Sequence, residues 1–239
     1  MSETYAIRLI GRKDVAEGTM AFLFEKPPGF NFKAGQFMRF TLIDPPETDA
    51  EGNARTFSIA SAPYEDSLMI ATRMRDTAFK RVLKAAAPGT SLAVRGPYGS
   101  LTLQEGASTP AVFLTGGIGI TPFRSILMQA AWDHLARKMT LFYSNRRPED
   151  AAFLDELSGL EGKLAGFKLV GVMSDMAGSK RAWDGARGRI DSEMLKNHIE
   201  DLTTPGYYVA GPPGMVGAML EILSSAGAGE VHVEQFAGY

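Results

Sequence analysis

A change of pattern near residue 104 is the strongest constraint on the fold of this chain. Before it, short runs of aliphatic, aromatic and β-branched residues are separated by Pro, Gly and Asp, which is typical of an antiparallel barrel. One helix is expected within this half, around residues 77–86. The predicted strands of this half lie at residues 5–10, 20–24, 37–43, 56–59, 68–72 and 91–94.

After residue 110, predicted strands and helices alternate, which indicates a doubly wound parallel sheet. The strands are expected at residues 111–115, 139–143, 167–173, 207–210 and 231–233. The helices are expected at residues 123–135, 149–157, 192–199 and 215–223. The polar stretch 104–110 has the composition of a linker. The sequence therefore predicts an antiparallel β-barrel domain over residues 1–104 and an α/β domain over 110–239.

Composition excludes several classes of site. The 239 residues carry a net charge of −2, so no nucleic-acid partner is expected. The absence of cysteine excludes disulfides, thiolate zinc sites and a cysteine-held iron–sulfur cluster in this sequence. The three histidines, His134, His198 and His232, are far apart, and no metal site is expected. No apolar run is long enough to span a bilayer, and the first residues lack a signal-peptide core, so we expect a cytoplasmic protein without membrane insertion.

Two motifs in the first half suggest phosphate binding. The run Arg55–Thr56–Phe57–Ser58 offers a guanidinium for a pyrophosphate and a hydroxyl for a ring nitrogen. Taken alone, it is equally a strand with one surface arginine. In the second motif Asp76 is expected to cap a helix whose free N–H groups suit a phosphate. Five basic residues gather there, as a binding field or as a solvated helix face: Arg73, Arg75, Lys80, Arg81 and Lys84.

Two glycine-rich turns in the second half follow predicted strands and precede helices. They are residues 115–122 (TGGIGITP) and 210–215 (AGPPGM). Glycine lets a backbone approach a phosphate closely, and Pro122 suits a first helical turn. Neither turn is the full dinucleotide fingerprint, and each is compatible with a simple tight turn. Both should lie at the same edge of the sheet, because the carboxyl ends of parallel strands share one edge.

Taken in order, these strings resemble the ferredoxin–NADP reductase family, which includes cytochrome b5 reductases and reductase components of bacterial oxygenases. The matching pieces are RTFS (55–58), GPYGS (96–100), TGGIGITP (115–122), YSNR (143–146), AGPPGM (210–215) and EQFAGY (234–239). The resemblance implies an FAD-binding barrel followed by a nicotinamide-nucleotide domain. It also implies that a hydride passes between nicotinamide and flavin, and that single electrons pass to or from a partner.

The same resemblance implies roles for individual residues. Arg55 would meet the FAD pyrophosphate, Phe57 would lie beside the flavin, and Ser58 would lie near flavin N5. Tyr239, at the end of the chain, would stack on the flavin where the nicotinamide must land. The remaining FAD-binding residues are then Thr56, Ile70, Ala71, Thr72, Arg73, Thr77, Ala78 and Phe79. Those that would hold the nucleotide are Thr115, Gly116, Gly117, Gly119, Thr121, Asn145, Arg146, Ser174, Asp175, Gly211, Pro212 and Met215.

Two positions depart from the family pattern. Phe57 stands where the family often has tyrosine, so one phenolic hydrogen bond to FAD is lost. Ala210 stands where the family often has a cysteine close to nicotinamide C4. We also expect NADH to be favoured over NADPH, because Asp175 follows the strand at 167–173 where NADPH-using relatives carry an arginine. Arg146, Arg147, Lys180 and Arg181 argue the other way, and the alternative role of Asp175 is a turn cap.

Three functions remain open at this point. The first is a reductase for ferredoxin, flavodoxin or an oxygenase component, the electron carrier being a separate molecule. The second is a free-flavin or ferric reductase. The third is a flavin-bearing subunit that only conducts electrons within a larger complex. Glu234 is either a proton carrier near the flavin or an ordinary strand carboxylate.

Overall fold

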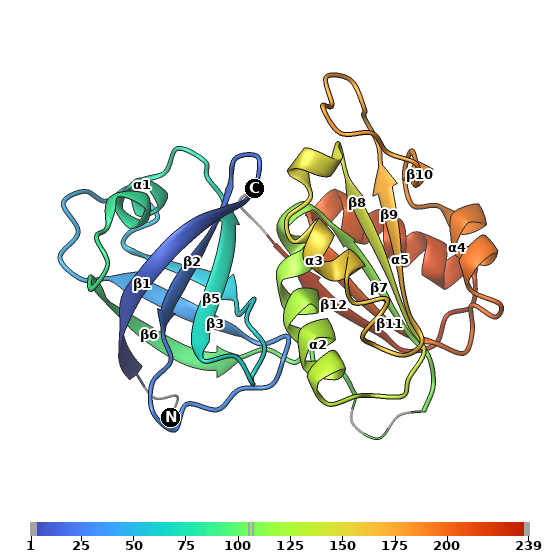
Figure 1. Ribbon diagram of the computed structural model, residues 1–239, viewed down its shortest axis with the longest axis horizontal. Helices are drawn as coiled ribbons and strands as arrows, with labels where there is room; N and C mark the ends of the chain where they lie inside the picture. Colours follow the sequence, from blue (N-terminus) through green and yellow to red (C-terminus); the bar gives the residue numbers. More distant parts are fainter. Residues whose placement is uncertain (1–3, 105, 107, 237–239) are drawn as a thin grey trace. The chain divides into compact units, whose positions relative to one another are not determined.

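The computed structural model describes residues 4–104, 106 and 108–236 (Figure 1). The chain forms two compact units, of which the first comprises Met1–Leu103 together with Thr121–Gln129. The second comprises Gln104–Ile120 and Ala130–Tyr239. The predicted functional domains, 1–104 for FAD and 110–239 for the nucleotide, stay predictions.

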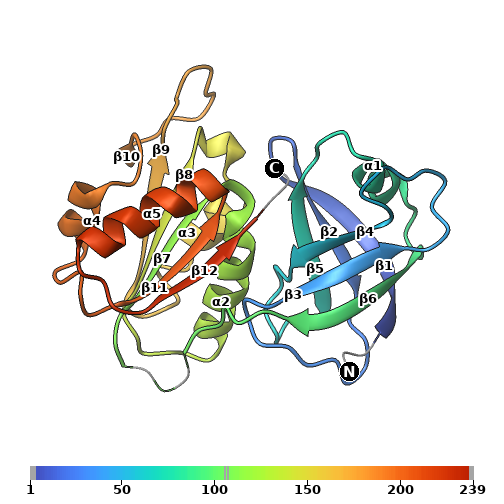
Figure 2. The same cartoon turned by 180° about the vertical axis from the view of Figure 1, so that it is seen from behind.

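The first unit is a curled antiparallel sheet of six strands in the order β4-β3-β6-β1-β2-β5, a half-barrel. This confirms the antiparallel barrel class predicted for the first half. Figure 2 shows the sheet from behind. The strands are β1 (Thr4–Ala16), β2 (Thr19–Glu25), β3 (Phe37–Leu42), β4 (Ala54–Ser58), β5 (Ser67–Arg73) and β6 (Ser91–Tyr98).

Alternation of side chains gives the half-barrel its core. Along β3 the pattern is half-buried, buried, exposed, buried, so that Met38 and Phe40 point inward while Arg39 points outward. The inward residues of β1, β2 and β6 meet them, with Phe22, Phe24 and Val94 fully buried. Helix α1 (Ala78–Ala85) adds Phe79 and Leu83 to the same cluster. Phe57 of β4 and Phe79 of α1 therefore pack on the same core, which fixes the position of both elements.

The second unit is a parallel sheet in the order β10-β9-β8-β7-β11-β12, which confirms the predicted doubly wound class. Its helices lie on both faces, α3 on the face seen in Figure 1 and α4 and α5 on the face seen in Figure 2. The strands are β7 (Ala111–Gly116), β8 (Met139–Asn145), β9 (Phe167–Met173), β10 (Ala186–Arg187), β11 (Gly206–Gly211) and β12 (Val231–Gln235). The α-helices after residue 110 are α2 (Ile120–Trp132), α3 (Leu154–Ser158), α4 (Ser192–His198) and α5 (Pro213–Ser225), and Thr121–Gln129 of α2 belongs to the first unit.

The predicted helix over residues 149–157 is wrong in length. A 3-10 turn, η2 (Pro148–Asp150), comes first, and α3 begins only at Leu154. The cause is Phe153, whose φ of 61° is left-handed and cannot continue a right-handed helix. The two-residue strand β10 was not expected, because two residues show no periodicity.

Candidate functional site

Arg55 on β4 is fixed by a dense set of acceptors. Its Nη2 donates to Asp49 Oδ1 at 2.8 Å and lies 2.9 Å from Glu51 Oε2. Its Nη1 donates to the carbonyls of Glu51, Gly52 and Ala54 at 2.9–3.0 Å. The guanidinium also lies over the ring of Phe79, 5.5 Å from the centroid. The side chain is therefore held at the surface in one position, with its charge facing anions.

Ser58, at the end of the same strand, is a buried hydroxyl without a partner. It is 3% exposed, and among the described residues its Oγ has no hydrogen bond. An unsatisfied buried hydroxyl costs about 1–3 kcal/mol, so it points to a ligand that completes it. A flavin ring nitrogen is such a ligand, and the residues present fit FAD at this point. Between the two, Phe57 packs 5.8 Å from Phe40 and Phe79, whereas Thr56 is exposed.

The start of α1 differs from the expectation in one respect. The cap is Thr77, whose Oγ1 accepts a bond from Lys80 N–H, and not Asp76. The Asp76 carboxylate is instead paired with the guanidinium of Arg81 on the next turn. The N–H of Ala78 donates to Asp49 Oδ2 at 3.1 Å. The N–H groups of Ala78 and Lys80 at the start of this helix are thus bonded to Asp49 and Thr77, and phosphate binding there stays a prediction.

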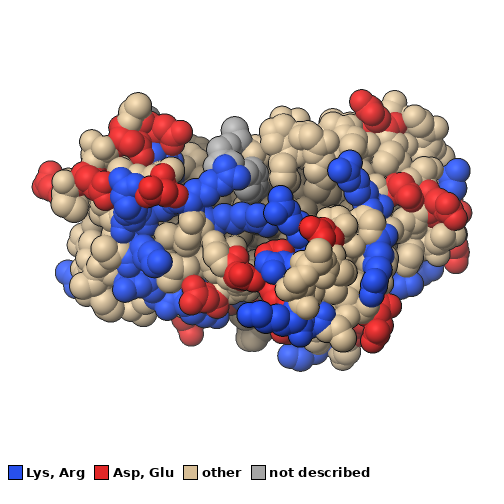
Figure 3. Space-filling view, turned by 90° about the horizontal axis from the view of Figure 1, so that it is seen from above, with Lys and Arg blue, Asp and Glu red and all other residues tan. Residues whose placement is uncertain are grey.

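The other FAD-side predictions fall on β5 and α1. Ile70, Ala71 and Thr72 are buried on β5, and Ile70 belongs to the hydrophobic core. Arg73 is half-buried at the end of the strand. Burial lowers the pKa of Lys80, and the charges of Arg75 and Arg55 lower it further. Acidic side chains lie among the basic ones in this region, on the left of Figure 3, and Glu47 and Asp76 both pair with Arg81 of α1.

The two glycine turns of the second unit meet. Strands β7 and β11 are parallel neighbours, and Thr115 Oγ1 donates to the carbonyl of Ala210 at 2.8 Å. A Cβ on Gly119 would lie 2.5 Å from that carbonyl oxygen and 2.8 Å from the Cα of Gly211. A Cβ on Gly116 would lie 2.7 Å from Met215 Sδ. The contact between the turns therefore needs glycine, and the predicted shared edge is observed.

The helices that follow these turns begin at the same edge. Residues Gly117–Gly119 form a 3-10 turn, with a left-handed φ of 56° at Gly117, before α2. Thr121 is buried in the first turn of α2. Pro212 caps α5, its carbonyl accepting from the N–H of Met215. At the start of α5, the N–H groups of Met215 and Val216 both donate to the Pro212 carbonyl, and at the start of α2 the N–H of Ile120 donates to the carbonyl of Gly117.

The end of β8 carries a buried amide without a partner. Asn145 is 6% exposed, and neither its Oδ1 nor its Nδ2 is bonded within the described part of the chain. Two residues earlier, the buried Tyr143 hydroxyl lies 3.1 Å from the carbonyls of Gly117 and Ala152. The side chain of Arg146 is exposed. The amide of Asn145 is thus a donor and acceptor pair available at the carboxyl edge of the sheet.

Ser174 and Asp175 directly follow β9. The Ser174 hydroxyl donates to the backbone carbonyl of Asn145 at 3.2 Å. Asp175 is exposed, and its Oδ1 accepts from the N–H of Ala177 at 3.0 Å, which is the turn-capping arrangement. Its second oxygen, Oδ2, has no hydrogen bond to any described residue and can accept one from a ligand.

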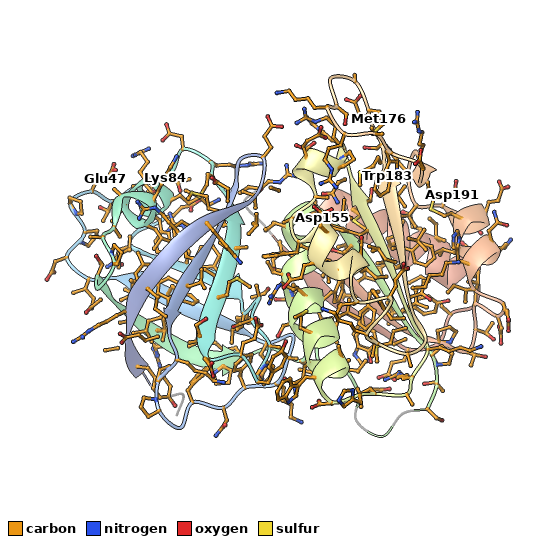
Figure 4. All side chains as sticks on the ribbon, viewed as in Figure 1. Glu47, Lys84, Asp155, Met176, Trp183 and Asp191 are labelled. Carbon is orange, nitrogen blue, oxygen red and sulfur yellow. The ribbon has the colours of Figure 1, made fainter. Side chains whose placement is uncertain are left out.

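The loop that continues from Asp175 is fastened by Glu149. Its carboxylate accepts from the Ser179 hydroxyl at 3.0–3.1 Å and from the N–H groups of Lys180 and Arg181. Desolvation alone would raise the pKa of Glu149, but these bonds and its own N–H lower the pKa to about 2. Arg181 is also paired with Asp155 of α3, at 2.7 Å. Figure 4 labels Asp155 and, in the loop, Met176. Glu149 and Asp155 therefore hold the Ser179 hydroxyl, the N–H groups of Lys180 and Arg181, and the Arg181 guanidinium.

Two site expectations concern the end of the chain. Tyr239, expected to cover the flavin, lies outside the described residues. Glu234 on β12 is half-buried, and burial raises its pKa to about 7. That pKa is suited to carrying a proton near neutral pH.

Sequence reasoning missed Asp49 and Glu149. Asp49 lies in a segment with turn composition, and Glu149 was expected at the start of a helix, so neither carboxylate was marked as a loop-fastening group. The only available signal was the acidic residue density of 47–51, next to a predicted phosphate-binding strand.

No helix among the described residues has the length and hydrophobicity needed to cross a membrane. Within the same residues no group of three or more acidic or His side chains is placed to hold a metal ion.

Comparisons with known proteins agree with this architecture. Residues 113–221 match the family model described as the oxidoreductase NAD-binding domain. The reductase component of propane 2-monooxygenase from Rhodococcus jostii (strain RHA1) is 30% identical over 211 residues, covering 84% of this chain and 54% of the relative. The chain thus spans about half the length of that reductase component.

Two further proteins match over nearly the whole length. Ferredoxin–NADP reductase B of Sorangium cellulosum (strain So ce56) is 26% identical over 247 residues, 98% of each chain. A crystal structure of a ferredoxin NADP+ reductase from Neisseria gonorrhoeae with bound FAD and NADP is 25% identical. It superposes with a TM-score of 0.81 over 97% of this chain and 98% of that one. The resemblance found in the sequence motifs is confirmed.

Proposed function

We propose that this chain, which resembles the ferredoxin–NADP reductase family in sequence and fold, passes electrons between a nicotinamide nucleotide and a separate one-electron carrier, with FAD bound to its first unit. The observation that carries the proposal is the buried hydroxyl of Ser58, which has no partner in the described part of the chain, on the strand that also presents Arg55. A strand with an anion-binding guanidinium at one end and an unsatisfied donor at the other fits a ligand with a phosphate and a polar ring. The Neisseria relative with bound FAD and NADP supports the choice of ligands.

In the first unit, Arg55 and the N–H of Ala78 would hold the FAD pyrophosphate, and Phe57 would flank the cofactor. Ser58 would donate to a flavin ring nitrogen. When bound, FAD accepts a hydride from the nucleotide and gives up its two electrons singly, which is chemistry that no side chain here supplies. The protein therefore positions and desolvates the cofactor, and Glu234 is available to hold a proton near neutral pH.

In the second unit, the paired glycine turns would take the nucleotide pyrophosphate at the starts of α2 and α5. Met215 and Pro212 would line that path, and the amide of Asn145 would gain the partners that it lacks. Ala210 offers no thiol, so hydride transfer would rest on positioning alone. The proposal requires no metal ion.

We also propose that NADH is favoured over NADPH. Asp175 lies directly after β9, where a carboxylate accepts bonds from ribose hydroxyls and repels a 2′-phosphate. At close range such repulsion is on the order of a few kcal/mol. Asp155 supports the same preference, because it pairs with the Arg181 guanidinium that a 2′-phosphate would otherwise attract.

Titration of the cofactor-free chain with FAD tests the first part of the proposal. The wild type should bind one FAD, and Arg55→Ala should bind it about 10- to 100-fold more weakly, through loss of a charge-assisted bond. Ser58→Ala should slow the reduction of the flavin by the nucleotide. Ser91→Ala is the control, because Ser91 is an exposed serine on β6 and its replacement should leave this rate unchanged. A chain that never binds FAD contradicts the proposal.

Steady-state turnover tests the rest. We expect reduction of ferricyanide by NADH, and faster turnover with a ferredoxin than with free flavin. A preference for free flavin would favour the second function, and failure with every acceptor would favour a conducting subunit. The ratio of kcat/KM for NADH and NADPH should move towards NADPH in Asp175→Arg. An NADPH preference in the wild type would contradict the nucleotide assignment.

A further inference from the structure

The loop between β3 and β4, residues 43–53, brings a carboxylate to the point proposed for the flavin pyrophosphate. Asp49 Oδ1 accepts from Arg55 Nη2 at 2.8 Å, and its Oδ2 accepts from the N–H of Ala78 at 3.1 Å. One carboxylate therefore bridges the guanidinium and the helix start, which are the two donors that a phosphate group would use.

The surroundings show that this point is built for an anion. Arg55 is 17% exposed and is oriented by three backbone carbonyls, so its charge is fixed in place. Lys80 and Arg75 add positive charge near the start of α1, and Glu51 Oε2 is a second carboxylate oxygen, 2.9 Å from Arg55 Nη2. Ser58, three residues further along the same strand and 3% exposed, is a separate sign of a ligand along β4, because its buried hydroxyl has no partner among the described residues.

We infer that Asp49 occupies the anion site of the cofactor-free chain and gives way to the FAD pyrophosphate, so that it sets the affinity of the chain for FAD. The inference rests on the proposed function. A carboxylate and a phosphate cannot share the same two donors, because like charges at that separation repel. Binding of FAD must therefore displace Asp49 from both donors.

The position of Asp49 makes this displacement feasible. Its side chain is 30% exposed, so the released carboxylate can be hydrated. Its Oδ1 also accepts from the N–H of Glu51 at 3.0 Å, a local turn that can persist without Arg55. Only chains in which Asp49 has left the two donors can bind FAD. The apparent affinity is therefore the intrinsic affinity multiplied by the fraction of chains in that open state.

The experiment compares FAD binding to cofactor-free wild type, Asp49→Asn and Glu47→Gln by fluorescence titration and stopped flow. Glu47→Gln is a matched control, since Glu47 lies in the same loop with the same charge but pairs with Arg81 at 2.5 Å (Figure 4). Inorganic pyrophosphate, by calorimetry, and riboflavin serve as probes with and without the phosphate groups. A purely structural role for Asp49 would not separate these two probes.

We expect Asp49→Asn to bind FAD about tenfold more tightly than wild type, with a faster association rate, for a wild type that is about 90% closed. Pyrophosphate affinity should rise with it, whereas riboflavin affinity and the Glu47→Gln values should stay unchanged. Unchanged or weaker FAD binding in Asp49→Asn, with wild type still binding FAD, would overturn the inference alone. Absence of FAD binding in all three proteins would overturn the proposed function and the inference with it.

Discussion

The hydroxyl of Thr115 donates to the carbonyl of Ala210 across 2.8 Å, and this bond joins the ends of β7 and β11. Both residues are fully buried. Because each strand runs directly into a glycine turn, the bond fixes the separation of the two turns that we propose to hold the nucleotide.

Replacing Thr115 by valine keeps the shape of the side chain and removes the donor. The Ala210 carbonyl then loses a buried partner, at a cost of about 1–3 kcal/mol in the free energy of unfolding. The KM for NADH should rise as well, since the turns lose their brace. Thermal unfolding and steady-state kinetics measure the two effects. Thr140→Val, on the neighbouring strand β8, should change neither, and equal effects of the two variants would contradict the role of Thr115.

The second prediction concerns the space between the turns. Gly119→Ala places a Cβ 2.5 Å from the Ala210 oxygen, so that backbone on both turns must shift. Such overpacking costs about 1–3 kcal/mol, and nucleotide affinity should fall with stability. In Gly217→Ala on α5 the new Cβ has no atom within 4 Å, and helix propensity should stabilise the chain by about 0.5–1 kcal/mol. We expect a lower Tm for Gly119→Ala and a higher Tm for Gly217→Ala. A Gly119→Ala protein with the Tm and the KM of wild type would contradict the prediction.

The sequence predicted the fold well where periodicity is long. The short apolar runs of the first half and the strand–helix succession after residue 110 are set by burial, and the structure confirms both classes. The helix at 149–157 was wrong because the left-handed backbone of Phe153 is a tertiary outcome that no local pattern marks. The Asp76 cap was wrong because a carboxylate that can cap can also pair with Arg81, and the pair formed.

Within the candidate site, the sequence predicted only the contacts that follow from the order of the strands. The contact of the two glycine turns follows from the rule for parallel strands, so the sequence sufficed for Thr115 and Gly211. The bridge from Asp49 to Ala78 joins residues 29 positions apart through an irregular loop. Such contacts depend on where the loop folds, and its sequence carries only turn residues.

The third prediction is a pH dependence of stability from Glu234. Burial raises its pKa from 4.5 to about 7, so the folded chain holds a proton that the unfolded chain has released between these values. By linkage, the free energy of unfolding falls as pH rises from 4.5 to about 7 and stays lowered above it. Glu234→Gln removes the ionisable group, and its Tm should exceed that of wild type by several degrees at pH 8. Near pH 4.5 the two should agree. Parallel Tm profiles across this range would contradict the prediction.

The last prediction sets stability against binding at Asn145. Its amide is buried without a partner among the described residues, which destabilises the nucleotide-free chain by about 1–3 kcal/mol. Asn145→Leu has a similar shape and no polar atoms, so its free energy of unfolding should rise. If the amide serves the nucleotide, the same variant should bind NADH about tenfold more weakly, the loss of roughly one hydrogen bond with its unmatched ligand partner.

Asn53→Leu supplies the matched control, because Asn53 Nδ2 does have a partner, the Leu42 carbonyl at 2.9 Å. That variant should lose stability and leave NADH binding unchanged. Thermal unfolding of the nucleotide-free proteins and NADH titration by fluorescence give both quantities for each variant. An Asn145→Leu protein that is destabilised would mean that the amide is satisfied in the folded chain. An Asn145→Leu protein that is stabilised but binds NADH as tightly as wild type would remove Asn145 from the nucleotide site. The amide would then lower stability without contributing to NADH binding.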